Sequence, residues 1–137
     1  MALSSDPTNT SHNPQSGYSP VIFDTNSLMM PFQFKVNIDL ELDRLMGFWY
    51  GIVPSCVIDE LAGLSKTYPH ARAARKLAEK YEIVETKAAG DDGVLEAVRK
   101  TGGILLTNDK ELKKRAITFG SKVIYLRKKK YLVISGE

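Results

Sequence analysis

The residues of this chain that could do chemistry are four carboxylates, which occupy similar positions relative to short apolar runs. Each lies at the end of a short apolar run or in the segment of helical spacing that comes next, and the four are Asp24, Glu60, Asp91 and Asp109. Carboxylates that are brought together repel one another, and without compensation some of them would take up protons. A divalent cation removes that repulsion, and ligands that offer only oxygen favour Mg²⁺ or Mn²⁺ over zinc. The pattern predicts a site for such an ion.

Each carboxylate also has a purely structural alternative. Aspartates are favoured at helix N-caps and acids suit the first turn of a helix, which would account for Asp91 and Asp109. The run Asn108–Glu111 even has capping-box spacing, with the asparagine as the cap. Glu60 lies at the border of an apolar helix face and could be a surface residue. Asp24 is the hardest to explain in this way, because an acid that ends a buried strand needs a partner.

Short apolar runs alternate with segments of helical spacing along the chain. The expected strands are 21–23, 51–54, a run around Ile83, 103–107 and 122–126, with a further edge strand near 131–134. The expected helices are 38–50, 55–65, 71–81, 91–102 and 108–120. This alternation predicts a mostly parallel sheet with helices on both faces. Ligands of such sheets bind at the carboxyl ends of the strands, where all four acids would then lie.

The 137 residues are enough for one domain with a single core. Residues 1–20 are rich in Ser, Thr, Asn and Pro, with almost nothing to bury, so we expect a disordered N-terminal tail and a folded domain over 21–137. No apolar run approaches the ~20 residues of a membrane span, and no secretory signal is recognisable. We therefore expect a cytoplasmic protein with no membrane partner.

Four stretches carry a resemblance to a known family. "VIFDTNSLM", "GIVPSCVIDEL", "GDDGVLEAV" and "ILLTNDKELKKRA" resemble the four successive motifs of PIN domains, which are metal-dependent ribonucleases. The resemblance covers residues 21 to about 126, in the family's order. It implies a three-layer α/β/α sandwich whose central, mostly parallel sheet has four to five strands. It also implies that the acidic quartet holds one or two Mg²⁺ or Mn²⁺ ions, with Asp92 as a secondary ligand and Asn26, Thr107 and Asn108 supporting the acids.

The activity that this resemblance implies is hydrolysis of RNA phosphodiester bonds by an endoribonuclease. The adjacent acids of "GDDGVLEAV" and the basic C-terminal strand resemble the branch that processes ribosomal RNA precursors. That branch implies pre-ribosomal RNA as the substrate, ribosome-assembly factors as partners and a role in ribosome biogenesis. The alternatives are a VapC-type toxin ribonuclease of a toxin–antitoxin pair and a non-catalytic PIN-fold RNA-binding module. PIN domains often form homodimers, and a homodimer is expected here too.

RNA needs positive surface away from the acids, because carboxylates without a cation repel phosphates. Two basic runs near the C-terminus are the candidates, since phosphate contacts give affinity without sequence choice. Their members are Lys110, Lys113, Lys114, Arg115, Arg127, Lys128, Lys129 and Lys130. The alternative is that these side chains are simply solvated, or that lysines shield an exposed sheet edge.

Overall fold

Six strands form one sheet in the computed structural model, which describes residues 17–135. The strands are β1 (Ser19–Phe23), β2 (Trp49–Pro54), β3 (Glu82–Val84), β4 (Ile104–Leu106), β5 (Val123–Arg127) and β6 (Tyr131–Ile134). Their order across the sheet is β3-β2-β1-β4-β5-β6. The first five run parallel, and β6 pairs antiparallel with β5. The mostly parallel sheet is confirmed, with six strands instead of four to five, because β6 returns as a hairpin.

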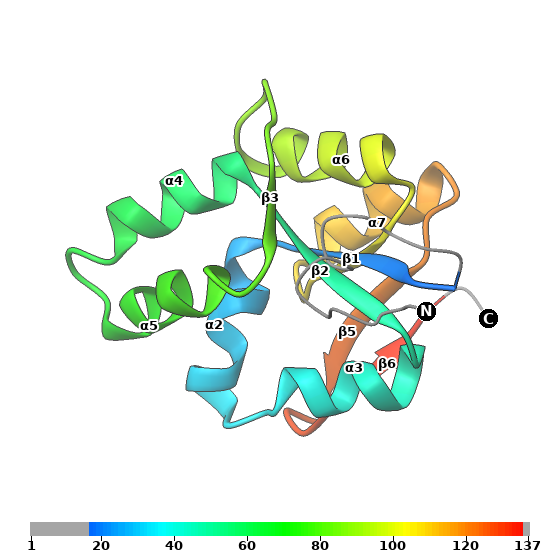
Figure 1. Ribbon diagram of the computed structural model, residues 1–137, viewed down its shortest axis with the longest axis horizontal. Coiled ribbons are helices and arrows are strands. Elements are labelled where there is room, and N and C mark those ends of the chain that lie inside the picture. The colour runs from blue at the N-terminus through cyan, green and yellow to red at the C-terminus, as the bar shows by residue number, and fades with distance from the viewer. Residues whose placement is uncertain (1–16, 136–137) are drawn as a thin grey trace, which may run out of the picture.

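Helices connect the strands and cover both faces of this sheet (Figure 1). They are α2 (Thr25–Phe34), α3 (Ile38–Met46), α4 (Ser55–Leu64), α5 (Pro69–Ala78), α6 (Gly90–Thr101) and α7 (Lys110–Thr118). In Figure 1, α3 lies across one face, against β2 and β6, and α6 and α7 lie over the other face. The remaining helices, α2, α4 and α5, pack on one another beside the sheet. This is the expected α/β/α sandwich.

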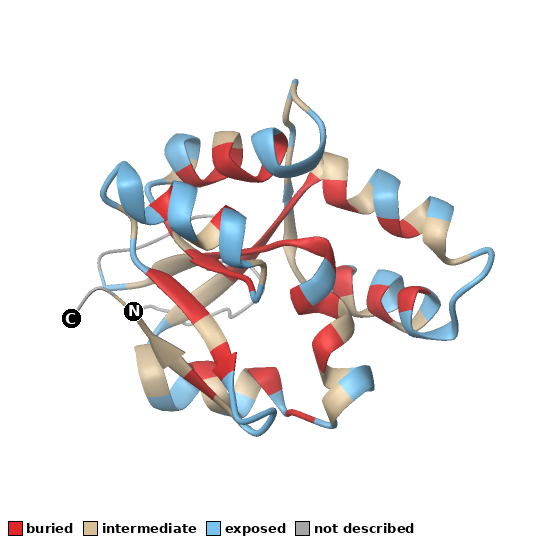
Figure 2. Ribbon diagram, turned by 180° about the vertical axis from the view of Figure 1, so that it is seen from behind, coloured by how far each residue is buried: buried red, intermediate tan, exposed pale blue. Residues whose placement is uncertain are grey.

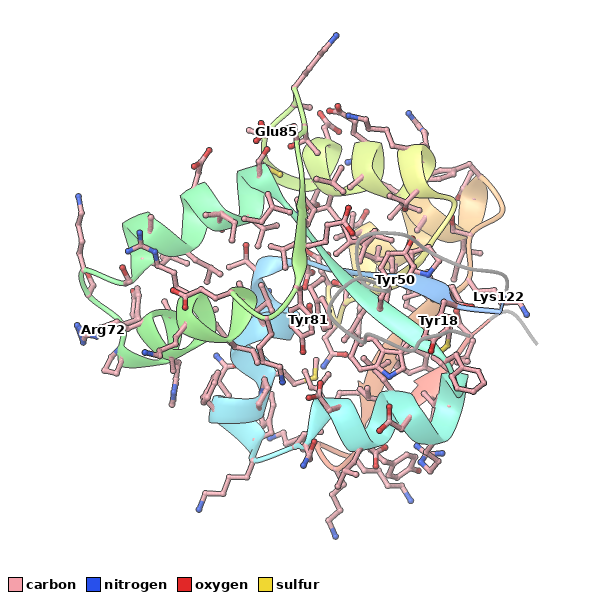
Figure 3. The ribbon with its side chains drawn as sticks, viewed as in Figure 1. Tyr18, Tyr50, Arg72, Tyr81, Glu85 and Lys122 are labelled. Carbon is pink, nitrogen blue, oxygen red and sulfur yellow. The ribbon has the colours of Figure 1, made fainter. Side chains whose placement is uncertain are left out.

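The core lies along the central strands. Val21, Ile22 and Phe23 of β1 are all fully buried, and Figure 2 shows the buried band running through the inner strands with exposed surface on the outer helix faces. Strands covered on both faces read as continuous apolar runs, as these do. The ring of Tyr81 stacks on Phe23 with 4.7 Å between centroids, and Figure 3 shows it directed toward the sheet from the segment before β3.

Most helices and strands lie within about three residues of the expected bounds, and two helices differ more. The helix expected over 38–50 ends at Met46, because Gly47 takes a left-handed backbone with φ 74° and the chain turns into β2. The helix α2 was not expected at all. Its first turn is Thr25, Asn26 and Ser27, which are weak helix formers, and Pro31 lies inside it. The cap formed by Asp24 and packing against α5 outweigh those propensities.

The boundary of the expected tail also shifts. Residues 1–16 lie outside the described part of the chain, whereas Ser19 and Pro20 belong to β1. Proline lacks the N–H that a central strand needs. It is accommodated here because β1 pairs only with β2 at that point, and its pairing with β4 begins one residue later, at Val21. Within residues 17–135, no helix has the length and apolar character to span a membrane.

Candidate active site

Asp24 is a buried carboxylate whose two oxygens are both engaged. It ends β1 and caps α2, where Oδ1 accepts a hydrogen bond from the Ser27 N–H at 2.8 Å. The Thr107 hydroxyl donates to Oδ2. Only 6% of Asp24 is exposed. Burial raises the pKa of Asp24, the hydrogen bonds from Thr107 and Ser27 oppose that rise, and the negative charge of Asp109 adds to it.

Thr107 links Asp24 to Asp109. Strand β4 pairs with β1 through Leu106 and Phe23, which brings the residues after both strands together at the carboxyl edge. The Thr107 hydroxyl donates to Asp24 and accepts the N–H of Asp109 at 3.0 Å. Thr107 is fully buried. The sheet therefore positions this pair of acids through one shared hydroxyl group.

Asp109 has the structural role that the sequence assigned to its neighbour. Its Oδ1 caps α7 by accepting the N–H groups of Glu111 and Leu112, at 2.9 and 3.1 Å. The expectation that Asn108 is the cap is wrong, because the Asn108 side chain reaches across to accept the Leu126 N–H of β5 at 2.7 Å. Asp109 thus caps α7 and also lies with the other acids at the carboxyl ends of the strands, which we call the acidic edge. Its Oδ2 takes no part in the cap.

Glu60 reaches the same edge from α4. The Thr25 hydroxyl, next to Asp24 in the chain, donates to Glu60 Oε1 at 2.7 Å. Thr25 is 8% exposed, whereas Glu60 is exposed. Asn26, which was expected to support the acids, is exposed and makes no side-chain hydrogen bond among residues 17–135. Sequence patterns did not single out Thr25 or Ser27, because their hydroxyl partners are a remote glutamate and a backbone carbonyl.

Asp91 and Asp92 begin α6 on the opposite side of the edge. The cap residue of α6 is Ala89, so neither acid caps this helix. Partial burial raises the pKa of Asp91, and the charge of Asp109 raises it further, with smaller contributions from Asp92 and Glu60. Arg115 of α7 opposes these effects. Asp91 makes no hydrogen bond within residues 17–135, whereas Asp92 Oδ1 pairs with Arg115 Nη2 at 2.6 Å.

Gly93 allows α6 to lie close to α4. A Cβ at this position would lie 2.4 Å from the Ala88 carbonyl oxygen and 2.5 Å from Cys56 Sγ at the start of α4. Any larger residue would push the two helices apart. This close approach is what brings Asp91 within electrostatic reach of Glu60.

The acids fit a hard cation in chemistry and in charge. All of the candidate donors are carboxylate oxygens, and no lysine or arginine of the described chain pairs with the buried Asp24. Asp109 raises the pKa of both Asp24 and Asp91, and Arg115 opposes that effect only at Asp91. As their side chains are placed, no three His, Cys, Asp or Glu residues among 17–135 are close enough to share one ion.

The basic residues expected to contact RNA lie on α7 and on the turn between β5 and β6. Lys113 places its Nζ 3.5 Å from the centroid of the Tyr125 ring, and Lys129 places its Nζ 5.9 Å from that of Phe34 at the end of α2. Lys128 and Lys129 both have left-handed backbones, with φ of 54° and 57°. Lys35, which ends α2 with φ 58°, is a further lysine beside Phe34.

Comparison with known proteins gives one family and two curated relatives. A family model described as a PIN-like domain matches residues 21–129. "Ribonuclease VapC9" of Archaeoglobus fulgidus is 39% identical over 118 residues, covering 82% of this chain and 87% of that protein. "Ribonuclease VapC4" of Methanocaldococcus jannaschii is 31% identical over 127 residues, covering 85% of this chain and 96% of that protein.

Two solved structures share the fold. The PIN domain endonuclease Utp24 aligns with a TM-score of 0.73 at 24% identity, covering 85% of this chain and 90% of that one. A domain of a functionally unknown protein from Methanocaldococcus jannaschii aligns with a TM-score of 0.59 at 19% identity, covering 80% of this chain and 91% of that one. At these identities the likeness is one of fold.

Proposed function

The chain belongs to the PIN-like domain family, and from that membership we propose that it is an endoribonuclease that depends on Mg²⁺ or Mn²⁺. The observation that carries the proposal is Asp24. It is a buried carboxylate at the carboxyl edge of a parallel sheet, its pKa is raised by burial and by Asp109, and no cationic side chain of residues 17–135 compensates its charge. A buried charge is costly unless it is paired, and a divalent cation is the partner that suits this set of oxygens.

Three of the acids, Asp24, Asp91 and Asp109, would hold one ion, and Glu60 would contribute to the same ion or to a second, with Asp92 as a secondary ligand. A bound Mg²⁺ or Mn²⁺ supplies Lewis-acid stabilisation of the phosphodiester and makes water more acidic. Hydrogen bonds from Thr107 and Ser27 favour the charged form of Asp24, which keeps it ready as a ligand. The Asp109 cap leaves Oδ2 of that residue available to the edge.

Arg115 is a basic side chain in contact with the acids. It pairs with Asp92 at 2.6 Å, and its charge lowers the pKa of Asp91 against the other influences on that residue. Both partners of the pair are exposed, so the guanidinium group is open to a phosphate of the substrate. We assign Asp92 chiefly to holding Arg115 at the rim, and Arg115 to an RNA phosphate beside the cleavage site.

The turn between β5 and β6 is a second basic surface. Its consecutive left-handed residues are the central pair of a four-residue turn closed by the Lys130 N–H and the Arg127 carbonyl, and Asn-Gly is preferred at such a pair because side chains with a Cβ are strained there. This chain instead has Lys128 and Lys129 at those positions. Strain that persists in a native fold points to function. The lysines of this turn, with Lys35 nearby, are proposed to hold the RNA backbone.

The strained turn can be tested by making it ideal. The pair of substitutions Lys128→Asn and Lys129→Gly should raise the free energy of unfolding by ~1–2 kcal/mol, because it relieves two left-handed residues. It should also weaken RNA binding and reduce the salt dependence of log Kd by about two counterions. Chemical denaturation and fluorescence anisotropy measure the two effects.

The control is the double variant K66N/K76N, which removes the same charge from exposed positions on the α4–α5 side. It should leave the salt dependence of RNA binding unchanged. If both double variants weaken binding equally, net charge is responsible and the turn has no specific role.

Two substrate classes remain within this activity. Processing of ribosomal RNA precursors in the cytoplasm, with ribosome-assembly factors as partners, is supported by the pair Asp91–Asp92 and by the basic C-terminal hairpin. A toxin-type ribonuclease is the second candidate. It is supported by the curated relatives, both of which are named VapC ribonucleases at 39% and 31% identity. A toxin would arrest growth when expressed without its antitoxin, whereas a processing nuclease would alter precursor RNA.

The deciding experiment is cleavage-site mapping on total RNA and on precursor ribosomal RNA, with Mn²⁺ or with EDTA. We expect cleavage with the metal and none with EDTA. Cuts at one precursor position support processing, and cuts in a transfer or messenger RNA support the toxin class. Unchanged cleavage in EDTA, or binding without cleavage in any metal, would contradict the proposed enzyme and favour the non-catalytic alternative.

A homodimer is also part of the proposal. Large apolar side chains on the described surface, including Phe32, Leu40, Phe48 and Tyr68, are between 37% and 65% exposed. Light scattering of the purified protein gives its mass in solution. A monomer at all concentrations would contradict the dimer without affecting the proposed activity.

A further inference from the structure

Thr25 makes a contact that neither its helix nor the core requires. Its hydroxyl donates to Glu60 Oε1 at 2.7 Å, across 35 positions of sequence, and joins the start of α2 to the second turn of α4. Threonine in a helix usually returns its hydroxyl to the carbonyl four residues earlier. Thr25 is the first residue of α2, and the residue four before it, Val21, lies within β1. The hydroxyl is therefore directed out of its own element.

The two partners differ in freedom. Thr25 is 8% exposed, and its β-branched side chain has a restricted χ1 angle, so the hydroxyl is a fixed donor. Glu60 is exposed on α4 and has three rotatable bonds. Without a partner it would occupy many conformations in solvent. A hydrogen bond to a charged acceptor is stronger than one between neutral groups. The bond holds Oε1 and leaves Oε2 as the free oxygen of Glu60.

We infer that Thr25 is a positioning residue, which holds the carboxylate of Glu60 at the edge where Asp24 ends β1, so that Glu60 presents an oxygen to the proposed cation. This inference rests on the proposed metal-dependent function and names a residue that acts through Glu60. Thr25 adjoins Asp24 in the chain, so one segment supplies a ligand and also the group that orients a second ligand from another helix. A competing explanation is that the bond only ties α2 to α4.

Metal binding separates these explanations. Thr25→Val keeps the shape of the side chain and removes the hydroxyl. If Thr25 positions Glu60, Mn²⁺ affinity measured by calorimetry or by the resonance of free Mn²⁺ should fall roughly tenfold, as for other groups that orient metal ligands. The kcat for RNA should fall as well, whereas KM should not change. Thr25→Ser keeps the donor and should restore Mn²⁺ affinity to within about twofold of the parent.

The decisive comparison is a double-mutant cycle with Glu60→Ala. Because Thr25 acts only through Glu60, the variant T25V/E60A should bind Mn²⁺ as weakly as E60A alone. Thr118→Val is the matched control, since it removes a hydroxyl that bonds only to the Lys114 carbonyl within α7. It should leave Mn²⁺ affinity and cleavage unchanged.

The outcomes are distinguishable. If E60A weakens Mn²⁺ binding and T25V does not, or if the two effects add fully, Thr25 does not position Glu60 and the inference fails. If T25V lowers only the melting temperature, the bond is a structural tie and the inference fails likewise. If E60A leaves Mn²⁺ binding unchanged, the metal role of Glu60 in the proposed function is itself wrong.

Discussion

The two sides of the acidic edge are built in different ways. On the β1–β4 side, Asp24 is buried, and hydrogen bonds from Ser27 and Thr107 hold both of its oxygens. On the α6 side, Asp91 is exposed and makes no hydrogen bond within residues 17–135, and Asp92 pairs with an exposed arginine. One side is therefore set by the sheet, whereas the other can still adjust.

The difference shows which carboxylate lowers the stability of the metal-free fold. A buried carboxylate with a raised pKa opposes folding when it is charged, and the hydrogen bonds offset only part of that cost. Asp91 is more exposed than Asp24, so its charge loses less hydration and opposes folding less. We expect a cation to stabilise the fold mainly through Asp24, and to draw Asp91 inward from a position that is not yet fixed.

The largest expected effect comes from Asp24→Asn. Asparagine keeps the helix cap but cannot supply a charged ligand, so cleavage should fall by about 10²–10³-fold. The metal-free variant should melt at a higher temperature than the parent at neutral pH. Melting in EDTA and RNA cleavage in Mn²⁺ measure the two effects. The control is Asp59→Asn, an exposed acid on α4, which should change neither.

The same residue predicts a pH dependence. Burial raises the folded pKa of Asp24 above its ordinary value of 3.8, so the folded protein holds this proton more tightly than the unfolded chain does. The metal-free parent should gain stability as pH falls from the raised pKa toward 3.8, and lose it as pH rises through that window. Asp24→Asn should lack this contribution. Equal pH profiles for the two proteins would contradict the burial argument.

The second largest loss of cleavage is expected for Asp91, on the α6 side of the acidic edge. Asp91→Asn should lower cleavage by about 10²-fold, because it removes a ligand charge. It should raise metal-free stability by less than Asp24→Asn does, because the Asp91 side chain is more exposed than that of Asp24. Cleavage assays and urea denaturation test this contrast with Asp24→Asn. A gain in stability for Asp91→Asn as large as that for Asp24→Asn would show that the two sides are alike.

Thr107→Val tests how the hydrogen bonds on the β1–β4 side support Asp24. It removes the hydroxyl that Asp24 and the Asp109 N–H share, without changing the shape of the side chain. The free energy of unfolding should fall by about 1–3 kcal/mol at neutral pH, since a buried carboxylate loses a donor. Urea denaturation measures it, and Thr107→Ser should restore most of the loss. An unchanged stability would mean that the hydroxyl does not support Asp24.

Arg115→Ala should have the smallest effect on the fold. Its pair with Asp92 is exposed, so stability should change by less than about 0.5 kcal/mol. RNA binding should weaken, and its salt dependence should fall by about one counterion. Arg72→Ala is the control, because Figure 3 shows this arginine pointing away from the molecule on α5. If the two variants lose the same RNA affinity, Arg115 has no specific role in binding RNA.

Much of this arrangement was predictable from local patterns. Apolar runs followed by acids predicted the strand ends, and glycines and helical spacing predicted most helices to within a few residues. The prediction failed where local propensity was misleading. In α2, weak helix formers and Pro31 concealed a helix that packs against α5. At the start of α7, Asn108 and Asp109 are both good caps, and only the position of Leu126 on β5 decides between them.

The sequence by itself determined which residue types stand after which strands, and hence that carboxylates gather at one edge, because parallel strands end on the same side. Tertiary structure alone decided how each acid is held. Thr25 meets Glu60, Thr107 meets Asp24 and Arg115 meets Asp92 across 35, 83 and 23 positions of sequence. Such contacts depend on how strands register and helices pack, and no local periodicity encodes them.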